Sequence, residues 1–186
     1  MSSYERIVAM WRGYNVKSEA DVDLRLHSFR ILFAYHSGKI ENDRITYHDT
    51  REIFENGRIL NYTGDYVIGR EEVGSLPGDV EADLKDLLAE LQEHGESDTL
   101  KAAAYFHARF EYIHPFADGN GRVGRTLMNY FLILRGHPPI IVFDERKREY
   151  YAALERYDRS EDLEPVYVFL RNEACATWEK ALARGN

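Results

Sequence analysis

Apolar residues recur at helical intervals along most of this 186-residue chain. Spacings of three, four and seven residues, which place side chains on one face of a helix, mark three consecutive segments. The middle segment follows Ser97 and Asp98, either of which can serve as its N-cap. We therefore expect three amphipathic helices, with apolar faces formed by Val80, Leu84, Leu87, Leu88 and Leu91, then Phe106, Phe110 and Ile113, then Val123, Leu127, Tyr130, Phe131 and Leu134.

The flanking segments are predicted to be helical as well. Residues 24–36 carry apolar side chains on more than one side, which is typical of a largely buried helix. Residues 46–49 have the Thr-x-x-Asp spacing of a capping box and would open a short helix. Pro165 suits the first turn of a last helix. A helix over residues 145–157 would point inward with Tyr150, Tyr151, Leu154 and Tyr157.

Residues 62–73 differ from the rest because Thr, Tyr, Val and Ile residues are flanked there by glycines. This composition predicts a short β-hairpin or an extended flap. No internal repeat or linker is visible, so residues 1–186 are predicted to form a single domain. The predicted fold class is all-α, a mainly helical bundle with a small β-hairpin flap.

Composition and charge exclude several classes of protein. Apolar residues make up 44% of the chain and charged residues 30%, as in an ordinary water-soluble protein. No run of about 18 apolar residues is present, and residues 1–11 lack the pattern of a signal peptide. Cys175 has no second cysteine to pair with. Together these observations lead us to expect a cytoplasmic protein that does not enter a membrane. A net charge of −8 argues against nucleic acid as a partner.

One short segment, His114–Arg125, gathers residues suited to phosphate chemistry. Its Gly-Asn-Gly tripeptide lies where a loop ends and a helix begins, so backbone N–H groups there can turn toward an anion. The positive end of the helix dipole adds to this attraction. Arg122 and Arg125, three residues apart on the first helical turn, can both bond phosphate oxygens. The arrangement predicts a binding site for a polyphosphate.

Asp118 and His114 supply a metal ligand and a base beside this site. Asp118 is a hard oxygen ligand suited to a Mg²⁺ ion that also contacts the phosphates. His114 can accept a proton from an attacking hydroxyl group, as histidine does in general acid–base catalysis. Each residue alone would be ordinary in a turn or on a solvated helix face. Their order and spacing together predict phosphoryl or nucleotidyl transfer.

The same segment resembles the signature of the Fic family, His-x-Phe-x-Asp/Glu-Gly-Asn-Gly/Lys-Arg-x-x-Arg, at every specified position. The resemblance implies that His114 is the general base and that Asp118 binds Mg²⁺. It also implies an ATP-binding role for Gly119, Asn120, Gly121, Arg122 and Arg125, the last of these at the γ-phosphate end.

Two positions of the signature add detail to this expectation. Phe116 would be a core anchor that fixes the loop. Relatives that resemble the Doc toxins, which transfer a phosphate instead of AMP, have Lys where this chain has Gly121. Gly121 therefore favours the orientation of ATP that leads to AMP transfer.

Residues 37–42 resemble a second motif of the family, the inhibitory motif Ser/Thr-x-x-x-Glu-Gly/Asn. A carboxylate at Glu41 can pair with Arg125 and occupy the guanidinium fork that should bind the γ-phosphate. Because the motif precedes the signature, residues 24–42 are expected to form an N-terminal inhibitory helix. Ser37 and Glu41 are its inhibitory residues, and we expect self-inhibition in cis.

The resemblance also implies a β-hairpin flap at residues 66–73, which would hold a target protein by strand addition. Tyr151 is similar in position to a tyrosine that lines the adenine pocket in the family. The flap residues expected near the nucleotide are Ile68, Gly69, Arg70 and Glu71.

The resemblance thus implies a protein adenylyltransferase that moves AMP from ATP to a Tyr, Thr or Ser hydroxyl of a target protein, with release of pyrophosphate. Self-modification is one version of this reaction. Two alternatives stay open: a hydrolase that removes AMP at the same site, and a non-catalytic nucleotide-binding regulatory module. The intact His114 argues against the second alternative. The sequence leaves open whether the protein is a homo-oligomer.

Overall fold

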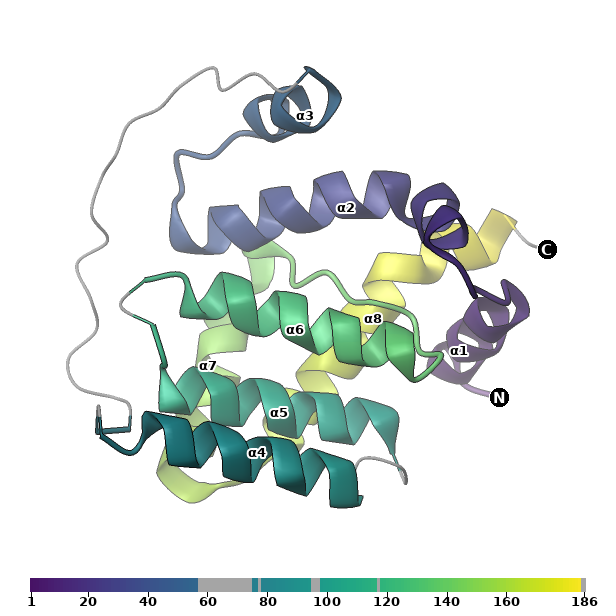
Figure 1. The fold of residues 1–186 in the computed structure, drawn as a ribbon. Helices are drawn as coiled ribbons and strands as arrows, with labels where there is room; N and C mark the ends of the chain where they lie inside the picture. Colours follow the sequence, from purple (N-terminus) through teal and green to yellow (C-terminus); the bar gives the residue numbers. More distant parts are fainter. Residues whose placement is uncertain (57–74, 77, 95–97, 117, 185–186) are drawn as a thin grey trace.

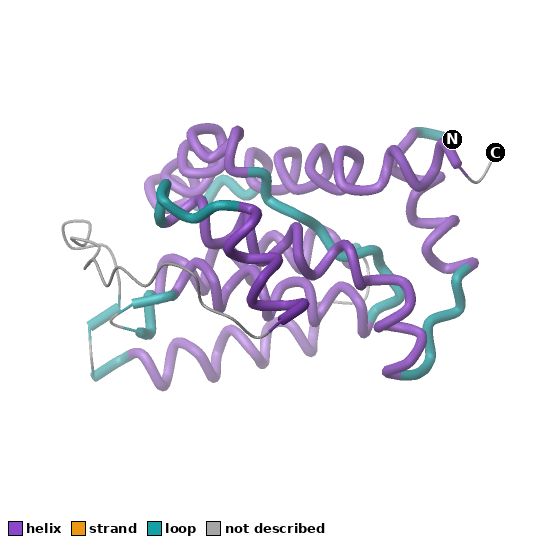
Figure 2. The backbone as a smooth tube through the Cα atoms, turned by 90° about the horizontal axis from the view of Figure 1, so that it is seen from above, coloured by secondary structure: helices purple, strands orange, loops and turns teal. Residues whose placement is uncertain are grey.

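The described part of the chain is helical and contains no strand (Figure 2). This confirms the mainly helical prediction. The predicted flap at residues 66–73 lies outside the described residues. In this computed structural model the described residues are 1–56, 75–76, 78–94, 98–116 and 118–184.

Short connections join consecutive helices, except between α3 and α4, where residues 57–79 intervene. None of the described helices has the length and the apolar run that crossing a lipid bilayer takes. Their bounds are α1 (Ser3–Gly13), α2 (Glu19–Glu41), α3 (Tyr47–Asn56), α4 (Val80–His94), α5 (Thr99–Ile113), α6 (Asn120–Leu134), the short 3₁₀ helix η1 (Asp144–Arg146), α7 (Lys147–Ser160) and α8 (Glu164–Arg184).

Four of these helices form a row. Figure 1 shows α4, α5, α6 and α2 side by side in this order, with α7 and α8 packed behind α5 and α6. The N-terminal helix α1 contacts the C-terminal helix α8. Helix α6 therefore has α5 on one side and α2 on the other, which places the first turn of α6 next to the end of α2.

Side-chain caps explain where two of the helices begin. The Asp98 carboxylate accepts a hydrogen bond from the backbone of Lys101 at 3.0 Å, so α5 starts where the sequence predicts. A capping box between Ser18 and Asp21 opens α2 at Glu19. The helix predicted from residue 24 is therefore longer at its N-terminal end than expected.

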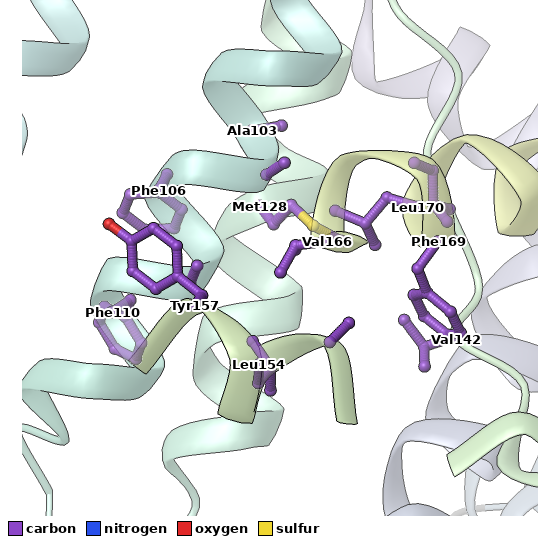
Figure 3. Close-up of a cluster of buried hydrophobic side chains, with 14 of the residues drawn as sticks. Ala103, Phe106, Phe110, Met128, Val142, Leu154, Tyr157, Val166, Phe169 and Leu170 are labelled. Atoms are coloured by element: carbon purple, nitrogen blue, oxygen red, sulfur yellow. The ribbon is translucent and has the colours of Figure 1, made fainter. Parts of the chain in front are cut away.

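The main core lies between α5, α6, α7 and α8 (Figure 3). Buried residues labelled there are Ala103, Phe106 and Phe110 from α5, Met128 from α6, Leu154 and Tyr157 from α7, Val166, Phe169 and Leu170 from α8, and Val142 from the loop between α6 and η1. A second cluster, formed by Ile7, Trp11, Leu26 and Trp178, joins α1, α2 and α8.

The buried face of α6 differs from its predicted apolar face. Leu127, Tyr130 and Leu134 are exposed, whereas Arg125 and Asn129 are buried. The Asn129 amide exchanges two hydrogen bonds with the backbone of Ile140, at 2.7 and 2.8 Å. Polar side chains that satisfy buried partners therefore define the inner face of this helix, and periodicity of apolar residues does not reveal them.

Gly124 sets how closely α6 approaches α5. A Cβ atom at this position would lie 2.9 Å from the Glu111 carboxylate, 3.0 Å from the Phe110 ring and 3.2 Å from the His107 ring. These distances are shorter than ordinary van der Waals contacts. The two helices are in contact here because residue 124 has no side chain.

Replacing Gly124 with Ala is therefore expected to destabilise the protein. The crowding cost of about 1–3 kcal/mol exceeds the gain in helix propensity of up to about 1 kcal/mol, so thermal unfolding should occur at a lower temperature. Gly13→Ala is the matched control, because nothing lies within 4 Å of its Cβ position. It should leave the melting temperature unchanged or raise it. Equal melting temperatures for the two variants would contradict the packing argument.

Candidate functional site

The signature segment forms the loop between α5 and α6 and the first turns of α6. Two residues with left-handed backbone conformations turn the chain: His114, with φ 53°, ends α5, and Gly119, with φ 83°, precedes α6. The His114 Nδ1 atom lies 3.3 Å from the carbonyl oxygen of Glu111. Because a carbonyl only accepts, this contact places the proton on Nδ1 and leaves Nε2 as the basic nitrogen.

Asn120 fixes the shape of this loop. Its side-chain amide accepts from the Phe116 backbone N–H at 2.8 Å and donates to the Phe116 carbonyl at 2.6 Å. The Asn120 side chain is therefore used for hydrogen bonds within the loop. The groups suited to bind an anion are the backbone N–H groups of the first turn of α6. The prediction that Phe116 is a core anchor is wrong, because its side chain is 49% exposed. The loop is fixed through the backbone of Phe116 instead.

Arg125 is the most deeply buried charge of the signature segment, with only 1% of its surface exposed. Its Nε donates to the Ser37 hydroxyl at 2.9 Å, and its Nη2 donates to the Ser37 carbonyl at 2.9 Å. Nη2 also lies 2.6 Å from Oε1 of Glu41. The predicted inhibitory residues Ser37 and Glu41 therefore both contact Arg125.

Glu41 contacts both arginines of the signature. While Oε1 pairs with Arg125, Oε2 lies 3.0 Å from Nε of Arg122. The Nη2 atom of Arg122 in turn lies 3.0 Å from Oδ2 of Asp118. A Cβ atom at Gly121 would lie 2.5 Å from Oε1 of Glu41, so this approach depends on a glycine at position 121. The sequence predicts only the pair with Arg125.

The surroundings of Arg125 also include two buried side chains, Tyr150 and His107, for which the sequence predicts no role in the site. Nη1 of Arg125 donates to the Tyr150 hydroxyl at 3.3 Å, and that oxygen lies 2.8 Å from Nε2 of His107. Burial raises the pKa of Tyr150, so its hydroxyl keeps its proton. Burial, together with the charge of Arg125, lowers the pKa of His107 to about 3. In the sequence, the signal for this network is that His107 lies on a helix whose buried face is otherwise apolar.

Asp118 is suited to a metal ion that is also bound by phosphates. Its carboxylate is solvent-accessible, with 75% of the side chain exposed, and it directly precedes Gly119, the N-cap of α6. Mg²⁺ is commonly held by one or two carboxylates plus phosphate oxygens, so the residues present fit that ion. A second group of ligand types, His36, Asp144 and Glu145, lies elsewhere. There His36 Nδ1 and Asp144 Oδ1 are 2.5 Å apart and form a hydrogen bond, which ties α2 to η1.

The remaining predicted site residues are Tyr151 and four residues of the predicted flap. Tyr151 is half-buried, and its ring centroid lies 5.2 Å from that of Tyr150. Its role at the adenine stays a prediction. The flap residues Ile68, Gly69, Arg70 and Glu71 lie outside the described residues.

Comparison with known proteins gives this site a family context. The model of the Fic/DOC family matches residues 24–132. The chain is 34% identical over 171 residues to protein adenylyltransferase fic-1 of Caenorhabditis elegans, an alignment that covers 88% of this chain and 33% of that protein. It is 32% identical over 149 residues to protein adenylyltransferase Fic of Aedes aegypti, covering 70% of this chain and 28% of that protein. The chain thus spans about a third of the length of these curated relatives.

Solved structures share the fold. A Fic domain containing signaling protein from Bacteroides thetaiotaomicron superimposes with a TM-score of 0.80 at 20% identity, covering 100% of this chain and 99% of the other. Fic-1 from C. elegans superimposes with a TM-score of 0.74 at 21% identity, covering 98% of this chain and 72% of that structure.

The buried histidines predict how stability depends on pH. The pKa of His107 is lowered to about 3, and burial lowers that of His137 to about 4. The unfolded chain takes up these protons near pH 6.5, whereas the folded chain does not. Stability should therefore be full above pH 6.5 and decrease toward pH 4. Each histidine should lower the free energy of unfolding by about 1.4 kcal/mol for every pH unit below 6.5, which amounts to about 2 kcal/mol at pH 5.

Urea unfolding at pH 7.5 and pH 5 measures this effect, because most carboxylates stay ionised over that range. The midpoint should be lower at pH 5, and His137→Gln should make the difference between the two pH values smaller. Equal midpoints for the unsubstituted protein at both pH values would show that these histidines are not buried in the neutral form.

Proposed function

The chain belongs to the Fic/DOC family, and from this premise we propose that it transfers AMP from ATP to a hydroxyl group of a protein. The observation that carries the proposal is the loop between α5 and α6, where His114 and Asp118 precede the anion-binding first turn of α6 and its two arginines. The names of the matched relatives, which are protein adenylyltransferases, support the same reaction.

In the proposed reaction the target hydroxyl oxygen attacks the α-phosphorus of ATP. Nε2 of His114 accepts the hydroxyl proton, the bond between the α-phosphorus and the bridging oxygen breaks, and pyrophosphate leaves. The backbone N–H groups at the start of α6 and the guanidinium of Arg122 bind phosphate oxygens. Arg125 binds the γ-phosphate end. Mg²⁺ held by Asp118 and the phosphates would neutralise charge on the triphosphate.

We also propose that the site is inhibited by its own chain. Glu41 occupies both arginines, with contacts of 2.6 Å to Arg125 and 3.0 Å to Arg122. A triphosphate in the productive orientation needs the same guanidinium groups, so it competes with a carboxylate that is already in place. The residues from Glu19 to Glu41 would then act as the inhibitory helix. A target segment would bind at the predicted flap, residues 66–73.

Removing the Glu41 carboxylate is the direct test of this inhibition. Glu41→Gly should raise AMP transfer roughly 10-fold or more, because both arginines then become available to the triphosphate. Intact-mass analysis after incubation with ATP and Mg²⁺ detects AMP added to the protein itself, and α-labelled ATP detects transfer to other proteins. The matched control is Asp43→Gly, because Asp43 pairs with Lys147 on the surface and not with the signature. Equal activity in both variants would refute inhibition by Glu41.

The role of His114 is tested in the Glu41→Gly background. His114→Ala should lower AMP transfer roughly 100-fold or more, since a positioned general base contributes about this much. The affinity for ATP should stay the same, because the phosphate-binding groups are retained. Transfer that survives this substitution would rule out the mechanism. Release of AMP from a previously modified target, without transfer from ATP, would identify the hydrolase instead.

A further inference from the structure

Arg125 receives most of its contacts from the inhibitory segment. Ser37 and Glu41, both near the end of α2, accept the bonds from Nε and Nη2. Tyr150, in the first turns of α7, accepts from Nη1 at 3.3 Å. The tyrosine hydroxyl therefore supports this guanidinium from outside α2, and the charge of Glu111 on α5 adds an attraction.

The Tyr150 hydroxyl is itself held in one orientation. An arginine only donates hydrogen bonds, so the tyrosine oxygen uses a lone pair for Arg125 and keeps its proton for another partner. Nε2 of His107 lies 2.8 Å from that oxygen and accepts the proton when the imidazole is neutral. The low pKa of His107, about 3, keeps the imidazole neutral at ordinary pH. The bonds therefore run in one direction, from Arg125 to Tyr150 to His107.

The surroundings leave this network little freedom to rearrange. Tyr150 and His107 are almost fully buried, and their rings stack with centroids 5.8 Å apart. Both belong to the central helices α7 and α5, which contact each other. A hydrogen bond to a charged donor inside such a site is stronger and more directional than one at the surface.

From this geometry we propose that Tyr150 is a positioning residue for catalysis: its hydroxyl orients the Arg125 guanidinium toward the γ-phosphate of ATP when Glu41 has been displaced. The inference rests on the proposed function, because it assumes that Arg125 binds that phosphate. It assigns to the first tyrosine of the Tyr150-Tyr151 pair a role in phosphate binding. The predicted adenine contact of Tyr151 is a separate matter.

The test compares ATP with ADP, which lacks the γ-phosphate. In the Glu41→Gly background, Tyr150→Phe keeps the buried ring and removes only the hydroxyl. Calorimetric titration with each nucleotide and Mg²⁺ should show ATP affinity falling roughly 10-fold and ADP affinity changing less than about 2-fold. A purely structural role would weaken both nucleotides alike, and that result, or no change for either, would overturn the proposal.

Two further variants sharpen the comparison. Tyr157→Phe makes the same substitution on the buried face of the same helix and should alter neither affinity. In an Arg125→Met background, Tyr150→Phe should cause no further loss of ATP affinity, because its effect acts through the guanidinium. An additional loss specific to ATP in that background would overturn the proposed route.

His107→Leu provides an independent variant if Tyr150→Phe does not fold, which circular dichroism would reveal. It keeps the tyrosine hydroxyl but removes the acceptor that orients it, so it should reduce ATP affinity by a smaller factor and spare ADP. An unchanged ratio of the two affinities would overturn the proposal. These binding measurements do not depend on AMP transfer. A Glu41→Gly protein that binds ATP but never transfers AMP refutes the proposed function and leaves the test of Tyr150 valid.

Discussion

A guanidinium group that is almost completely withdrawn from water is the constraint on which this site depends. Burying a positive charge is costly unless hydrogen bonds and an opposite charge surround it. Arg125 has both: a carboxylate from Glu41, a hydroxyl and a carbonyl from Ser37, and the hydroxyl of Tyr150. Burial acts to lower the pKa of Arg125, but the carboxylates of Glu41 and Glu111 outweigh it and raise that pKa above its ordinary value. These hydrogen-bond partners, which keep the charge in the interior, come from two helices, α2 and α7.

This requirement explains the arrangement of helices around α6. The end of α2 must lie beside the first turn of α6 for Glu41 to be within reach, and the His36–Asp144 bond fixes α2 to η1 at that point. On the opposite side, Gly124 lets α5 come close to α6, which places His107, the hydrogen-bond partner of Tyr150, against the turn that carries Arg125. Gly124, directly before Arg125, and His36, directly before Ser37, therefore both help to hold the charge of Arg125 in place.

The fold and the site could be predicted from the sequence to different depths. The helices from α4 to α8 follow from apolar spacing and caps such as Asp98, because these are local signals. The contact of Glu41 with Arg125 followed from a motif. Its second contact, with Arg122, depends on how two distant helices are docked. Phe116 and Tyr150 show the same limit. Phe116 belongs to the signature and was expected in the core, but it is exposed, whereas Tyr150, expected only to point inward, accepts a hydrogen bond from Arg125 through its hydroxyl. Spacing along one helix does not determine what lies across from it.

The absence of a side chain at position 121 has a consequence for how such sequences can change. The nearest atoms to a Cβ there would be Oε1 of Glu41 at 2.5 Å and Nη1 of Arg125 at 2.8 Å. Any larger residue at 121 therefore displaces the carboxylate that now sits against the guanidinium. Positions 41 and 121 are far apart in the chain, yet they are not free to vary separately. Among relatives of this chain, a glutamate at position 41 should therefore be accompanied by glycine at position 121.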